Sequence, residues 1–184
     1  MSGTSAWGSA LAAHRAATAE FSAQVTRVPP ERWHASAGEG KWSPAEEALH
    51  VAMAYEAVLG NLAGGTGMRL RVSPLRATLL RRVVLPWILR TGTFPRKVPA
   101  PREIRPSEAE AHALTAAALL QRLDHAANAA EIALQAADNR APSVRLVHAY
   151  FGALRPLPAL RLLSAHTRHH ARRLAQQGGG TDVH

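Results

Sequence analysis

Apolar residues recur along this chain at the alternating three- and four-residue spacings of amphipathic helices. Over residues 5–28 the recurring positions are Trp7, Leu11, His14, Thr18, Phe21, Val25 and Val28. Pro29 and Pro30 follow at once, and because proline cannot continue a helix, the pattern predicts that the first helix ends there. A single apolar face of this kind is typical of a helix in a bundle.

The second predicted helix has a clear start. Ser43 is the expected N-cap, Pro44 occupies the first helical position and Glu46 stands at the capping-box position. We expect the helix to span about residues 43–62 and to stop at the two glycines that follow. One of its faces carries His50, Ala54, Ala57 and Asn61. The small residues on this face leave room either for a ligand or for close helix packing.

Residues 66–106 have the least regular pattern. Leu75–Leu89 is typical of a short helix, which Pro86 should break or kink. Phe94–Pro101 contains several prolines and is expected to be extended. We interpret the whole segment as an excursion between helices. The alternatives are a lid over the bundle, a dimer contact, or a contact with a membrane surface.

A third long helix is predicted to begin at Ser107, with Glu110 at the capping-box position, and to end near Asp138. Its expected buried stripe consists of Leu120, Leu123, Ala127, Ala130 and Leu134. The connection that follows, residues 147–154, is apolar and is expected to pack against the bundle.

The fourth helix is expected to begin near Pro156 and to end at the glycines 178–180. Because no strand pattern or internal repeat is convincing, the four main helices predict an all-α fold, a four-helix bundle with a long crossover between helices two and three. We expect a single domain over residues 1–184, with a core of about 5–176 and a flexible tail over 177–184.

The amino-acid composition limits the fold class and the kinds of site that the chain can form. The chain is 47% hydrophobic and 5% aromatic, which favours a globular helical protein. It has no cysteine, so disulfides, thiolate nucleophiles and Cys-ligated zinc are excluded. Neither a signal peptide pattern nor an apolar run of about 18 residues is visible, so we expect a cytoplasmic protein without a membrane span.

The net charge of +9 permits nucleic acid, an anionic membrane surface or an anionic small substrate as a partner. The arginines are scattered, and no basic groove interleaved with aromatic residues is visible. We therefore expect a small-molecule substrate and no nucleic acid. Nucleic-acid binding remains the alternative that a steep loss of affinity with salt would reveal.

Three of the ten histidines are candidate metal ligands. His166 and His170 lie one helical turn apart, with Cβ atoms about 5–6 Å from each other, so both rings can reach one ion. A third histidine from a neighbouring helix, His50, would complete an N3 site with open coordination positions, which suits catalysis. His169 lies about 60° around the helix on the other side of His166 and is expected to face outward or to support the pair. The alternative is that these are ordinary histidines, because the spacing lacks the glutamate of the zincin motif.

Three segments together resemble the DinB-like superfamily of four-helix metalloproteins. Lys41–His50 is similar to the family's tryptophan and helix start, which lead to its first histidine. His148–Leu154 resembles an H-P-x-F-G-x-L stretch, and His166–Leu174 resembles its H-x-x-x-H helix. Phe94–Pro106 resembles the proline-rich crossover of one branch. The resemblance covers residues 5–176.

The resemblance implies an up-up-down-down bundle in which His50, His166 and His170 bind a divalent metal, commonly nickel or zinc. Characterised relatives use low-molecular-weight thiols; bacillithiol transferases and mycothiol-dependent enzymes are examples. The implied function is a metal-dependent thiol S-transferase or a hydrolase-like enzyme that uses such a thiol as co-substrate. The alternative is a non-catalytic bundle that binds a small molecule or a partner protein.

Other residues are expected near the metal. His148, His169 and Arg173 are candidates for supporting the ligands or binding substrate. Arg173 stands where the family often has glutamine, and Ala149 replaces its usual proline, which leaves substrate specificity open. Arg172 or Arg173 could hold the carboxylates of a thiol. The ring nitrogens that face away from the metal need partners, for which the sequence offers Glu46, Glu47 and Glu56 without ranking them. A homodimer is one way to cover the apolar, basic crossover.

Overall fold

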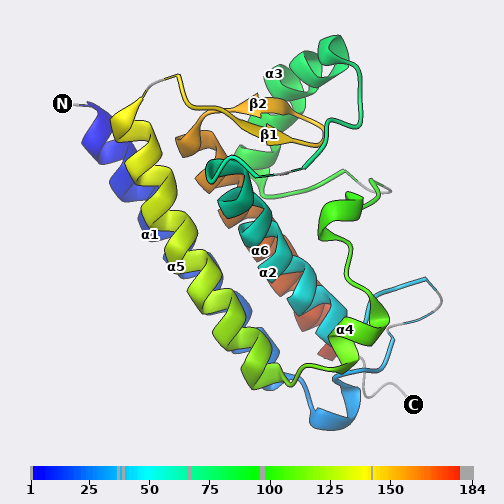
Figure 1. Cartoon of the computed structure of the whole chain (residues 1–184). Helices are drawn as coiled ribbons and strands as arrows, with labels where there is room; N and C mark the ends of the chain where they lie inside the picture. The colour runs from blue at the N-terminus through cyan, green and yellow to red at the C-terminus, as the bar shows by residue number, and fades with distance from the viewer. Residues whose placement is uncertain are drawn as a thin grey trace.

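The computed structural model describes residues 2–36, 38, 40–65, 68–95, 98–141 and 143–178 (Figure 1). Its helices are α1 (Ser2–Arg27), α2 (Pro44–Leu62), α3 (Pro74–Thr91), α4 (Glu108–His112), α5 (Ala116–Arg140) and α6 (Pro156–Gly178). Two 3-10 turns, η1 (Pro30–Arg32) and η2 (Arg102–Ile104), and two short strands, β1 (Leu146–His148) and β2 (Gly152–Leu154), complete it. The predicted helical fold class is confirmed.

Four long helices form the body of the molecule. α1 lies along α6 and also contacts α5, while α2 lies along α5 and also contacts α6 (Figure 1). The apolar stripes meet between them, and the largest fully buried side chains include Phe21, Leu49, Tyr55, Leu123, Leu134, Leu160 and Leu174. Many of the intervening positions are alanine, which lets the helix backbones approach closely.

The start of α2 follows its sequence signature. Ser43 Oγ accepts from the backbone N–H of Glu46, and the Glu46 carboxylate accepts from the backbone N–H of Ser43 at 2.8 Å. This capping box satisfies two N–H groups that a helix start leaves without partners. It also places His50 two turns into the helix, on the face that meets α6.

The structure of the crossover between α2 and α5 differs from two predictions. The expectation was a break or a kink at Pro86; α3 continues through Pro86 to Thr91, so a break is wrong. Pro86 is exposed, and the flanking Leu85 and Ile88 are buried against the rest of the fold, which holds the helix on both sides of the proline. The helix predicted from Ser107 is instead two helices, α4 and α5, since Thr115 caps a new start by accepting from the N–H of Ala118.

The connection to α6 contains a β-hairpin, although no strand was expected. β1 and β2 pair antiparallel, with Leu146 opposite Leu154, and strands of three residues are too short to show a two-residue period. Leu146, Phe151 and Leu154 are buried, so the expected packing of this connection against the bundle is confirmed. Gln177 and Gly178 belong to α6, and the rest of the predicted tail lies outside the described residues.

Candidate metal centre

His50 of α2 meets His166 and His170 of α6, more than 100 residues further along the chain. His166 Nε2 lies 3.0 Å from His50 Nε2 and 3.2 Å from His170 Nε2. The nitrogens that the three rings offer to a metal all lie within 4.8 Å of one another. His50 and His170 are buried, and His166 is half-buried. The cluster that the sequence predicted is therefore assembled by the fold, and its geometry is compatible with binding one metal ion.

The outer nitrogens of two rings determine which nitrogen faces the centre. His50 Nδ1 lies 2.6 Å from the carbonyl oxygen of Ile104, in η2. A carbonyl oxygen only accepts, so Nδ1 carries the proton and Nε2 presents a lone pair to the centre. His170 Nδ1 likewise donates to the Glu47 carboxylate. Two lone pairs and the third Nε2 converge, an arrangement that a divalent cation satisfies.

Glu47 is the partner that the sequence could not single out among three glutamates. Its side chain is fully buried, and Oε1 lies 2.6 Å from Arg173 Nη2 in an ion pair. Burial raises the pKa of Glu47, while the neighbouring Arg173 guanidinium opposes that shift. Arg173 thus contacts the carboxylate that pairs with His170, which fits the supporting role, one of the two that the sequence left open for it.

The other charged candidates have different partners. Glu46 belongs to the capping box, and Glu56 pairs with Arg122 of α5 at 2.6 Å. Arg172 donates to the carbonyl oxygen of Gly92 at 3.2 Å. These contacts leave Glu47 as the carboxylate that orients a candidate ligand.

The three candidate ligands are neutral near pH 7. Burial lowers the pKa of His50, and it lowers the pKa values of His166 and His170 well below the ordinary 6.5. Positive charge on a neighbouring histidine disfavours a proton on His166 or His170, which lowers the pKa values of these two residues further. Neutral imidazole is the form that binds metal.

Aromatic rings cover the histidines. The Trp42 ring lies 4.7 Å from the His50 ring, and the Phe94 ring lies 5.9 Å from that of His166. His169 is half-buried, and its ring lies 5.1 Å from the Phe94 ring. The sequence left open whether His169 faces outward or supports the pair, and the contact with Phe94 is not the outward position. Phe94 and the Ile104 carbonyl both come from the crossover. Sequence reasoning missed both, and a backbone carbonyl carries no sequence signal.

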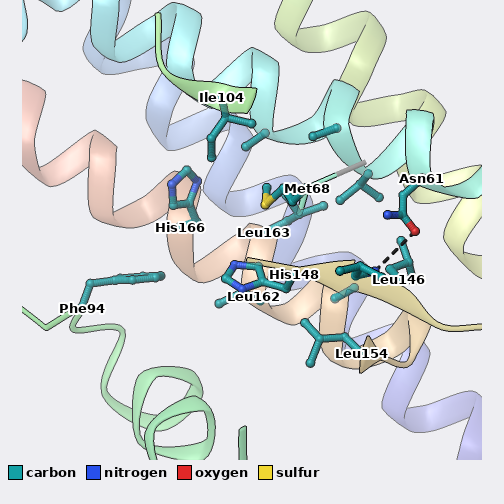
Figure 2. A pocket seen from close by; sticks show the side chains of 15 residues that line it. Asn61, Met68, Phe94, Ile104, Leu146, His148, Leu154, Leu162, Leu163 and His166 are labelled. Atoms are coloured by element: carbon teal, nitrogen blue, oxygen red, sulfur yellow. Dashed lines mark hydrogen bonds between the residues drawn. The ribbon is translucent and has the colours of Figure 1, made fainter. Parts of the chain in front are cut away.

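A pocket opens beside His166 (Figure 2). It has a volume of about 590 Å³, including space open to solvent, and lies between α2, α6, the β-hairpin and the crossover. The predicted small face of α2 contributes Ala54, Ala57 and Asn61 to its lining. His148 also lines it, and burial lowers the pKa of His148 to about 4. Of the three candidate ligands, only His166 is among the lining residues.

The family model for the DinB superfamily matches residues 10–174, from α1 to α6. The chain belongs to the DinB superfamily. Membership confirms the family that the histidine and tryptophan motifs predicted. Neither the curated proteins nor the solved structures compared with this DinB superfamily chain include a match. Among its described helices, none combines the length and apolar character needed to cross a membrane.

Proposed function

We propose that this DinB superfamily protein is a divalent-metal-dependent enzyme that transfers or uses a low-molecular-weight thiol at His50, His166 and His170. The observation that carries the proposal is the convergence of three neutral imidazole Nε2 atoms beside an open pocket. Nickel and zinc both accept imidazole ligands, and three protein ligands leave positions for small molecules.

A bound divalent cation would supply positive charge that lowers the pKa of a thiol and stabilises its anion. The protein itself contains no cysteine, so the thiol belongs to a substrate. Three neutral ligands leave the charge of the cation uncompensated within the set, which favours an anionic sulfur.

The residues around the cluster have separate tasks. The Ile104 carbonyl orients His50, and Glu47 orients His170 while Arg173 holds Glu47 in place. Trp42 and Phe94 pack against the rings of His50 and His166, and the lower exposure that such packing gives strengthens electrostatic interactions at the centre. Orientation by outer partners fixes the tautomer that each ligand must have.

The first test is the metal content of protein purified without a histidine tag. We expect about one divalent ion per chain, and loss of that ion in His50→Ala, His166→Ala and His170→Ala, because removing one of three ligands opens the site. His125→Ala is the matched control, since His125 is exposed on α5 and should leave the content unchanged. Wild-type protein that neither contains nor takes up a divalent ion would refute the proposal.

The second test addresses the thiol. Metal-loaded protein is incubated with an electrophile such as chlorodinitrobenzene and with cysteine, bacillithiol or mycothiol, and loss of free thiol is followed. We expect turnover that stops with chelator and in His170→Ala. Stoichiometric metal with no thiol consumption across this panel would favour the non-catalytic alternative.

A further inference from the structure

The pocket beside His166 is lined without formal charge. Its described lining residues are aliphatic or aromatic apart from one methionine, one asparagine and two histidines, and none is acidic, lysine or arginine. Charged ligand groups lose hydration in such surroundings and find no opposite charge among the lining side chains. The ligand body that fits this pocket is therefore uncharged and largely apolar.

The His148 ring in the pocket wall has one nitrogen that accepts hydrogen bonds from the backbone. His148 Nδ1 accepts from the backbone N–H groups of Tyr150, at 3.2 Å, and Phe151, at 3.3 Å. Because Nδ1 uses its lone pair on these two donors, the neutral ring carries its proton on Nε2. Within the described residues, Nε2 has no hydrogen-bond partner. The hairpin thus presents an N–H donor from a ring that lines the pocket (Figure 2).

A second donor comes from the metal centre. His166 Nδ1 is buried and has no hydrogen-bond partner in the described residues. Its Nε2 faces His50 and His170, and the two nitrogens lie on opposite sides of the ring, so Nδ1 points away from the cluster. When Nε2 serves as a ligand, Nδ1 carries the proton. Buried N–H groups are almost always paired, so a ligand acceptor has a place here.

We propose that this pocket binds an uncharged, largely apolar small molecule that carries an acceptor oxygen, such as an aryl ketone, with His148 Nε2–H donating to that oxygen. His166 Nδ1–H is the second donor available to the same molecule. The assignment rests on the proposed function: this molecule is the electrophilic substrate. The thiolate sulfur would add to its carbonyl carbon, so that a C–S bond forms as the C=O π bond opens, and the carbonyl oxygen would take up the proton that the thiol released. Arg172 and Arg173, which are paired elsewhere, do not select it.

Two probes of similar size and one charged probe test the assignment. Acetophenone has a carbonyl oxygen, ethylbenzene lacks it, and phenyltrimethylammonium carries a positive charge. Their dissociation constants are measured by NMR titration of the isotope-labelled, metal-loaded full chain. We expect acetophenone to bind about 5- to 10-fold more tightly than ethylbenzene, in the range of one hydrogen bond. Phenyltrimethylammonium should be the weakest of the three, because the described lining residues include no carboxylate and the bound metal ion would repel a cation.

His148→Asn removes the donor and keeps the hairpin. Asparagine Oδ1 can accept from the two backbone N–H groups in place of Nδ1. Its Nδ2–H2 group then lies near the position of ring Cδ2, so no donor stands where Nε2–H was. We expect acetophenone to weaken to the level of ethylbenzene while ethylbenzene is unchanged. His125→Asn, on the exposed face of α5, is the matched control and should change neither constant. Ala57→Phe, which fills the pocket from α2, should weaken both probes.

The outcomes separate the two proposals. Equal affinity for the three probes, equal weakening of acetophenone and ethylbenzene in His148→Asn, or unchanged binding in Ala57→Phe would overturn the pocket assignment. Metal content is measured in the same samples and should be unchanged in His148→Asn. Metal binding without discrimination between probes removes the pocket assignment alone, and discrimination without metal binding removes the proposed function and with it the substrate role.

Discussion

Replacing Glu47 with glutamine tests whether the buried carboxylate orients a metal ligand. The native carboxylate accepts from His170 Nδ1 through one oxygen and pairs with Arg173 through the other. Glutamine has one acceptor oxygen and one NH2 group, so it cannot serve both donors. Glu47→Gln therefore leaves either His170 or Arg173 facing an amide N–H, without changing the size of the side chain.

The magnitude follows from the position of Glu47. Outer partners of metal-bound histidines are worth about 10- to 100-fold in metal affinity. This range corresponds to about 1.4–2.7 kcal/mol of binding free energy. Arg173 is 39% exposed at its side chain and can turn toward water, whereas His170 is buried and cannot. The loss should therefore fall on His170 and on metal affinity.

The assay is a competition titration against a chromophoric chelator, with zinc and with nickel. Glu56→Gln is the matched control on the same helix, because Glu56 pairs with Arg122 and lies away from the histidines. We expect that control to bind metal like the wild type. A Glu47→Gln protein with wild-type helicity and a dissociation constant within about twofold of the wild type would contradict the predicted range of loss.

Three further predictions concern pH, packing and surface charge. Burial lowers the pKa of His148 from the ordinary 6.5 to about 4, so the stability that the neutral ring contributes is present above pH 6.5 and is lost as the pH falls toward 4. With chelator present, the melting temperature of His148→Asn should therefore fall less steeply than that of the wild type between pH 6.5 and pH 4. Parallel curves for the two proteins would contradict this. Leu134→Ala, at a fully buried position, should lower the free energy of unfolding by about 2–5 kcal/mol in urea titrations, whereas Ile132→Ala, at a position 69% exposed, should change it by less than about 0.5 kcal/mol. Arg122→Met removes surface ion pairs with Glu56 and Glu110 and should lower the free energy of unfolding by about 1 kcal/mol or less. The metal content should stay unchanged. A larger loss of stability would contradict the reading of these pairs as surface contacts.

Several elements were predictable because their causes are local. The capping box of Ser43 and Glu46, the proline stop after α1 and the apolar stripes of α5 and α6 all depend on residues within a few turns of each other. The pairing of His166 with His170 is local too, since four residues along a helix return to the same side. His50 came from its place at a family-like helix start, a weaker signal on its own.

Other features depend on segments that the sequence does not bring together. The hairpin was not predicted because strands of three residues show no two-residue period. The division between α4 and α5 depends on a single N-cap, Thr115. The Phe94 ring and the Ile104 carbonyl reach the histidines only because the crossover folds back on α2 and α6.

The sequence by itself determined the helical fold class, the start of α2, the family and the three candidate histidines, because helical periodicity, caps and motif spacing are properties of neighbouring residues. Only the tertiary structure decided which of three glutamates meets His170, which carbonyl meets His50, and that His148 and the small face of α2 line one pocket. Those choices depend on contacts between residues separated by 50 to more than 100 positions, such as the 123 residues between Glu47 and His170. Packing of the whole chain brings such pairs together, and no local pattern encodes them.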